Sequence, residues 1–79
     1  MKSYLELNHN YSIIEMETPK NWIGKSLDEL NLQNKDGLKV ISIKDRGSVD
    51  INPVQGRFFR EEDIIVVVGK KSKIMEYIR

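Results

Sequence analysis

Apolar and polar positions divide the chain into a few short segments with different periods. Residues 11–17 alternate, with Ser12, Ile14 and Met16 on one face, as in a half-buried strand. Residues 64–68 are all apolar, follow an acidic turn and stop at a glycine, which predicts a strand buried on both faces. Two short helices can cover one face of a small sheet, so the other face is a candidate contact for a partner.

A short helix is predicted after the first strand. Ser26 and Glu29 have the spacing of a capping box, in which each side chain binds a free backbone N–H group of the first turn. Leu27 and Leu30 supply its buried stripe, and Gly37 suits a left-handed exit from the last turn. A second helix near the C-terminus is indicated by helical spacing of Ile74, Met75 and Ile78. The aromatic residues predicted to pack in the core are Trp22, Phe58 and Phe59.

A strand and a hairpin are predicted between the two helices. Residues 40–43 carry the β-branched side chains typical of strands, and Gly47 with Ser48 is a candidate two-residue turn. That register would place Asp45 opposite Asp50, an unfavourable pair of like charges. A four-residue loop from Asp45 to Ser48 is the alternative. The result is a small α/β (α+β) fold in the order strand, helix, strand, strand, strand, helix.

Charge and composition narrow the classes of function. The 79 residues include 13 Lys and Arg against 12 Asp and Glu, and this balance gives no long-range attraction to nucleic acid or anionic lipid. The absence of cysteine excludes a disulfide framework and a thiolate metal site. The sequence has no signal-peptide core and no apolar run of the roughly 18 residues that a spanning helix needs. We therefore expect a cytosolic domain, either independent or part of a longer polypeptide.

No pattern in the sequence predicts catalysis or a metal site. There is no nucleophile paired with a base and no glycine-rich phosphate loop, so we do not expect an enzyme. His9 has no second nitrogen or sulfur ligand nearby and is interpreted as solvated. The consecutive acidic residues Glu61, Glu62 and Asp63 point in alternating directions on an extended segment and do not converge on a cation.

Four motifs are informative through their order and separation: residues 22–32 (WIGKSLDELNL), 40–43 (VISI), 51–53 (INP) and 63–69 (DIIVVVG). Together they resemble the C-terminal domain of RCK proteins (regulators of conductance of potassium), also called the TrkA-C domain. The resemblance covers residues 12–78. We therefore expect a TrkA-C-like domain over residues 11–79, and we expect residues 1–10, which lack a clean period, to be a lead-in or a linker remnant.

This resemblance implies a dimeric domain that follows a nucleotide-binding domain in cytosolic gating subunits of potassium channels and transporters. The implied partners are a second copy of the chain and a membrane channel or transporter for potassium or other cations, contacted directly or through that preceding domain. Neither nucleic acid nor direct membrane insertion is expected, and no cofactor is implied. In several bacterial members the cleft between two such domains binds cyclic di-AMP, which is the candidate ligand here. By position, the cleft residues correspond to Val40, Ile41, Arg46, Ile51, Asn52 and Pro53.

The chemistry of these residues fits such a ligand, although each also has an ordinary structural explanation. Apolar side chains can pack on adenine rings, Arg46 offers a forked donor to phosphate, and Asn52 can bond a base edge. Taken singly, Val40, Ile41 and Ile51 suit ordinary strand burial. Arg46 suits a solvated loop, and Asn52 suits a turn. Two hypotheses follow: a ligand-sensing regulatory domain, or a structural dimerisation module with no ligand of its own.

Overall fold

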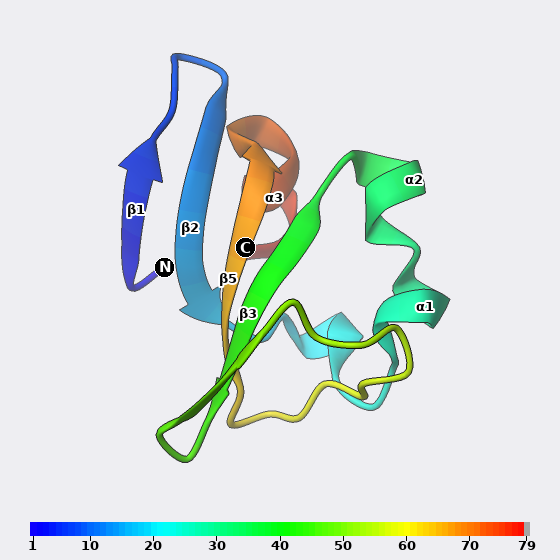
Figure 1. Cartoon of the computed structure of the whole chain (residues 1–79). Coiled ribbons are helices and arrows are strands. Elements are labelled where there is room, and N and C mark those ends of the chain that lie inside the picture. The colour runs from blue at the N-terminus through cyan, green and yellow to red at the C-terminus, as the bar shows by residue number, and fades with distance from the viewer. Residues whose placement is uncertain (79) are drawn as a thin grey trace.

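The computed structural model describes residues 1–78 and shows a five-stranded antiparallel sheet with the order β1-β2-β5-β3-β4 (Figure 1). The strands are β1 (Ser3–Glu6), β2 (Tyr11–Glu17), β3 (Lys39–Asp45), β4 (Ser48–Ile51) and β5 (Ile64–Lys70). The helices are the short 3-10 helix η1 (Lys20–Trp22), α1 (Leu27–Leu30), α2 (Leu32–Asp36) and α3 (Lys71–Ile78). In Figure 1, α3 lies behind the central strands, and α1 and α2 lie beside β3. The predicted α/β fold is confirmed.

The central strand of the sheet is β5, which pairs with β2 along its whole length and with β3 on its other side. Its side chains alternate, so that Ile65 and Val67 are fully buried while Val66 and Val68 are half-buried. We predicted burial on both faces, and the described chain covers only one face with helices. Neighbouring strands partly shield the second face. Cover of that face by another chain stays a prediction.

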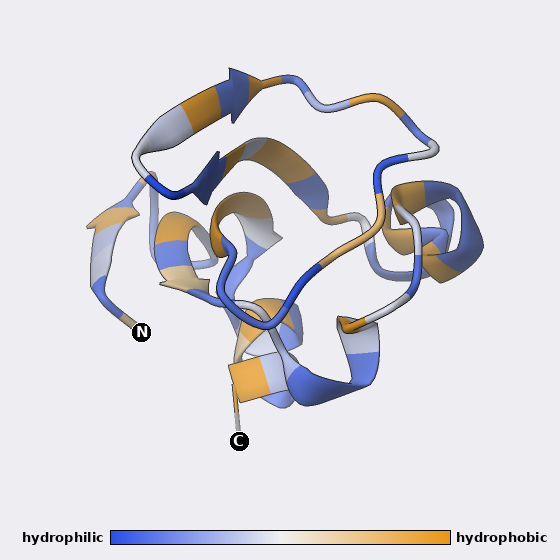
Figure 2. Cartoon of the chain, turned by 90° about the horizontal axis from the view of Figure 1, so that it is seen from below, coloured by the Kyte–Doolittle hydropathy of each residue, from blue (hydrophilic) through white to orange (hydrophobic). Residues whose placement is uncertain are grey.

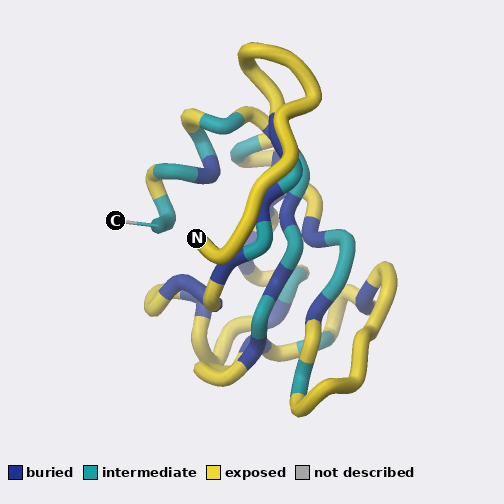
Figure 3. The backbone as a smooth tube through the Cα atoms, turned by 90° about the vertical axis from the view of Figure 1, so that its left-hand side faces the viewer, coloured by how far each residue is buried: buried dark blue, intermediate teal, exposed yellow. Residues whose placement is uncertain are grey.

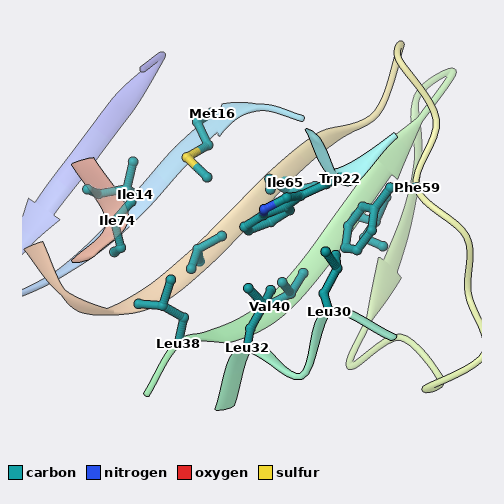
Figure 4. Packing of buried hydrophobic residues seen from close by; sticks show 12 residues of the cluster. Ile14, Met16, Trp22, Leu30, Leu32, Leu38, Val40, Phe59, Ile65 and Ile74 are labelled. Carbon is teal, nitrogen blue, oxygen red and sulfur yellow. The ribbon is translucent and has the colours of Figure 1, made fainter. Parts of the chain in front are cut away.

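One hydrophobic cluster fills the space between the sheet and the helices (Figure 4). Trp22 and Phe59 are its largest members, with ring centroids 5.4 Å apart, and Trp22 also meets the ring of Tyr77 from α3 at 5.0 Å. Phe58 is 57% exposed, so the prediction that it packs in the core is wrong. The segment is extended there, and turning Phe59 inward turns its neighbour outward.

The predicted first helix is two short helices joined at Asn31. Both halves of the capping box form: the Glu29 N–H donates to the Ser26 hydroxyl at 3.2 Å, and the Ser26 N–H donates to the Glu29 carboxylate at 2.9 Å. Asn31 has a left-handed backbone with φ 50°, which ends α1 and allows α2 to start in a new direction. Asparagine tolerates this conformation better than most residues. Gly37 ends α2 with φ 67°, as predicted.

The turn between β3 and β4 is centred on Arg46 and Gly47, one residue earlier than the predicted turn at Gly47 and Ser48. The alternative, a loop from Asp45 to Ser48, has this same centre, but the strands pair one residue closer to the tip than it requires. Arg46 and Gly47 both have positive φ, 53° and 82°, as a type I′ turn requires, and Asp45 pairs with Ser48. Asp50 therefore lies opposite Ile43 and not opposite Asp45. This register matches the natural twist of a hairpin and avoids the like-charge pair that the sequence suggested.

The segment expected to be a lead-in or linker remnant contains the edge strand β1. It pairs with β2, and all four of its residues are exposed (Figure 3). The sequence did not predict this strand because an edge that is open to water on both faces needs no apolar alternation. Whether residues 1–10 act with the domain or as a linker stays a prediction. No helix within residues 1–78 has both the length and the apolar character needed to cross a membrane.

Candidate functional site

A pocket of about 280 Å³ lies where α1, α2, the start of β3 and the segment after β4 meet. Its apolar lining residues are buried or half-buried, whereas its polar lining residues are exposed, which gives the pocket an apolar floor and a polar rim. The floor consists of Leu27, Leu32, Leu38, Val40 and Pro53, and the rim consists of Asp28, Asn31, Gln33, Asn34, Lys39, Asn52 and Gln55.

Three of the six predicted site residues, Val40, Asn52 and Pro53, meet in this pocket. Val40 is 5% exposed, so the expected strand burial and a place in the pocket floor apply together. Asn52 has a left-handed backbone with φ 54°, and its N–H donates to the carbonyl of Ile41 at 2.9 Å. This bond ties the segment after β4 back to β3 and fixes the position from which the Asn52 side chain projects.

The other three predicted residues lie outside the pocket. Ile41 is half-buried at an irregularity of β3 and fixes Asn52 through its backbone carbonyl. Arg46 is at the tip of the hairpin, where its side chain is 86% exposed and its Nε lies 3.9 Å from an oxygen of Asp45. Ile51 is 72% exposed on the edge strand β4. In a single chain, therefore, none of these three residues lines the pocket, and Arg46 follows the end of β3 opposite to Lys39 and Val40.

A buried ion pair anchors the segment of residues 52–63, which supplies one wall of the pocket. The guanidinium of Arg57 donates two hydrogen bonds to the Asp63 carboxylate, at 2.9 and 3.1 Å, and the backbone N–H of Arg60 donates a third at 2.8 Å. Burial alone would raise the pKa of Asp63, but these bonds and the charges of Arg57 and Arg60 hold it below its ordinary value. Asp63 is thus an ionised anchor of the loop.

The two walls of the pocket are also joined at the start of α1. The N–H groups of Leu27 and Asp28, which have no partner inside their own helix, donate to the carbonyls of Arg57 and Gln55 at 3.2 and 2.9 Å. Helix α1 and the loop therefore form one unit. Within residues 1–78, no three His, Asp or Glu side chains are grouped closely enough to hold a metal ion.

Helix α2 is held from the other side by α3. The hydroxyl of Tyr77 donates to the carboxylate of Asp36, the last residue of α2. Burial, and then this hydrogen bond, raise the pKa of Tyr77 to about 12. The pocket wall formed by α2 is thus attached to the C-terminal helix, which packs on the central strands.

The sequence analysis missed most of the polar rim of the pocket. Both glutamines of the chain, Gln33 and Gln55, and three of its six asparagines line it. The available signal was a concentration of amide side chains in residues 31–34 and 52–55, two segments that are distant in the sequence. Only the fold brings these segments together.

Residues 11–79 of the chain match the family model described as the TrkA-C domain. The chain belongs to this family. Ktr system potassium uptake protein A of Bacillus subtilis (strain 168) is 31% identical to it over 75 residues, and Ktr system potassium uptake protein C of the same organism is 28% identical over 74 residues. These matches cover 95% and 94% of this chain but 34% of each relative. The TrkA-C chain thus spans about a third of their length.

Solved structures share the fold. The RCK C domain of the potassium transport protein KtrA, in complex with cyclic di-AMP, has a TM-score of 0.77 and 22% identity over 85% of this chain and 79% of that one. The RCK_C domain dimer of S. agalactiae BusR, also in complex with cyclic di-AMP, has a TM-score of 0.67 and 22% identity over 86% and 88% of the two chains. The predicted TrkA-C fold is confirmed.

Proposed function

We propose that this TrkA-C domain is a cytoplasmic, ligand-sensing regulatory domain of a potassium or other cation transport system, and that it binds cyclic di-AMP between two copies of the chain. The observation that carries the proposal is the pocket in which Val40, Asn52 and Pro53 meet. Two solved domains of the same fold are complexes with cyclic di-AMP, and the sequence relatives are potassium uptake proteins.

The chemistry around the pocket suits an adenine dinucleotide. Val40 and Pro53 offer apolar surface to the face of a base, and the Asn52 carboxamide can bond a base edge or a phosphate oxygen. Arg46 is almost fully exposed and its one acidic neighbour lies at 3.9 Å, so its guanidinium can turn toward a phosphate.

A second copy of the chain would complete the site. Apolar residues alternate with polar ones along β4 and the segment after it, as the hydropathy colours at the top of Figure 2 show. Val49, Ile51 and Val54 are 56%, 72% and 73% exposed. Such side chains are typical of a surface that another protein covers. A two-fold dimer presents every contact twice and so matches a two-fold symmetric ligand.

The regulatory mechanism is a shift between two arrangements of the paired domains. Cyclic di-AMP bound between the copies favours the arrangement in which both halves of the site contact it. The change then reaches the channel or transporter directly or through a preceding nucleotide-binding domain.

Calorimetry with cyclic di-AMP tests the proposal. We expect one ligand to bind per two chains, and we expect Arg46→Ala and Asn52→Ala to weaken binding by about tenfold each, the loss expected for a charged or amide hydrogen bond. Lys20→Ala is the control, because this exposed cation lies on η1 and does not line the pocket. No binding to the wild-type domain at millimolar ligand would reject cyclic di-AMP.

The same exposed apolar surface also supports the alternative, a dimerisation module without a ligand. The two functions predict different melting temperatures for the domain in the presence of cyclic di-AMP, because a compound that binds the folded state must raise the melting temperature. A dimer whose melting temperature is unchanged by cyclic di-AMP favours the structural module. A chain that sediments as a monomer at all accessible concentrations contradicts both.

A further inference from the structure

We infer that the pocket of each chain holds one base of the ligand and reads it as adenine through the carboxamides of Gln33 and Gln55. This inference rests on the proposed function and assigns two residues that are not among the six site residues predicted from the sequence. It also explains how a small domain can select one cyclic dinucleotide over another.

The size of the pocket sets how much of the ligand one chain can hold. Ligand sites commonly have volumes of roughly 300–1,000 Å³. At about 280 Å³, this pocket suits a single purine and is too small for two bases with their ribose-phosphate ring. A symmetric ligand bound by two chains would therefore place one base in each pocket, with the sugar-phosphate ring between them.

The shape of the lining matches a base more closely than a phosphate. The floor has buried apolar side chains, including Leu32, Leu38 and Val40, that a flat ring can cover. The rim is made mainly of neutral amides, and its charged residues are one aspartate and one lysine. A phosphate would lose its hydration on such a surface without gaining a cluster of positive charge.

Gln33 and Gln55 are placed to read the edge of that base. All five carboxamides of the rim are exposed, but Asn34 donates to Asn31 at 3.0 Å and Asn52 is already assigned to the ligand above, which leaves Gln33 and Gln55. They come from two different elements, α2 and the loop, and both have fixed backbones. The backbone carbonyl of Gln33 accepts a hydrogen bond from the N–H of Gly37 at 3.0 Å, and the backbone carbonyl of Gln55 accepts one from the N–H of Asp28 at 2.9 Å.

The pattern of donors and acceptors favours adenine over guanine. A carboxamide presents one donor and one acceptor side by side, which matches the N7 acceptor and N6 amine of adenine. Guanine presents two acceptors at the same positions, N7 and O6, and is matched by arginine or lysine. Asp28 on the rim can only accept, and it adds to the preference for an amine over a carbonyl oxygen. Lys39 is the rim residue that would favour guanine.

Calorimetry with cyclic di-AMP and cyclic di-GMP on wild type, Gln33→Leu and Gln55→Leu tests this inference. We expect the wild type to prefer cyclic di-AMP, and each variant to bind it about tenfold more weakly while the affinity for cyclic di-GMP changes little. The preference ratio thus falls in the variants, which a general loss of stability would not produce. Asn21→Leu, which changes an exposed amide outside this pocket, should leave both affinities unchanged.

The outcomes separate this inference from the function on which it rests. If the wild type does not bind cyclic di-AMP, the proposed function itself fails. If the wild type binds it and both glutamine variants keep the wild-type affinity and preference, the function stands and base reading by Gln33 and Gln55 is refuted. Equal affinities of the wild type for cyclic di-GMP and cyclic di-AMP also refute the inference, and indicate that Lys39 contributes to binding the base. The emission of the buried Trp22 reports whether each variant is folded.

Discussion

The buried ion pair between Arg57 and Asp63 allows a quantitative prediction of stability. Asp63→Asn keeps the size of the side chain but removes the negative charge that balances the positive charge of Arg57, whose side chain is only 16% exposed. Removing one partner of a buried pair costs roughly 3–5 kcal/mol. The carboxamide still accepts one hydrogen bond and Arg57 keeps some water, so we expect the lower end, about 3 kcal/mol. This is a large share of the roughly 4–12 kcal/mol by which a domain of this length is stable.

Urea unfolding followed by tryptophan fluorescence measures the loss, because Trp22 is the single tryptophan and is fully buried. The matched control is Arg60→Met, which removes an arginine–aspartate pair with the same 2.9 Å distance from the same loop. Arg60 is 56% exposed, and we expect a loss below about 1 kcal/mol. Equal losses in the two variants would refute the reasoning from burial.

The dependence on pH gives a second check of the same pair. The pKa of Asp63 is lower in the folded state than in the unfolded chain, so the charged carboxylate favours folding. Its contribution is complete above the unfolded pKa and is lost as the pH falls through the folded one. The difference in unfolding free energy between wild type and Asp63→Asn should therefore shrink in strong acid. A difference that stays constant there contradicts the assignment.

Two further predictions concern the packing of the sheet and α3. A Cβ atom on Gly69 would lie 2.5 Å from Cδ2 of the buried Leu38, so Gly69→Ala should lower the unfolding free energy by about 1–3 kcal/mol in urea. Tyr77 has a raised pKa of about 12, so its contribution to stability is complete below the ordinary tyrosine value and is lost as the pH rises through about 12. An absorbance titration should lose its highest-pH component in Tyr77→Phe, and an unchanged high-pH component in that variant would contradict the assignment.

Local signals in the sequence predicted local structure well. The capping box of Ser26 and Glu29 and the left-handed exit at Gly37 depend on residues a few positions apart, and both form as predicted. The central strand was also predicted, because its apolar run is too short for a typical helix and ends at a glycine. The position of the turn at Arg46 and Gly47 agrees with the alternative loop from Asp45 to Ser48, but its tight two-residue form was not predicted, because a non-glycine residue with positive φ is uncommon and leaves no clear signal.

Features that depend on distant contacts were not predicted from the sequence. Asp63 was interpreted only as one of three consecutive acidic residues that do not converge on a cation, and its full burial against Arg57 was not predicted. The pocket was predicted only through its share of the family positions, Val40, Asn52 and Pro53. Its glutamines were missed because nothing in the sequence shows that residues 31–34 and 52–55 lie across a cavity from each other.

The position of β5 in the middle of the sheet has a consequence for biosynthesis. Its partners β2 and β3 precede it in the chain and do not pair with each other. The pairs β1–β2 and β3–β4 are therefore not joined into one sheet until β5 has been made as far as Lys70. On the ribosome, the earlier strands emerge with their apolar faces uncovered and wait for this last strand. We expect folding to begin only when β5 leaves the exit tunnel, which makes the nascent chain a client for chaperones that shield exposed strands.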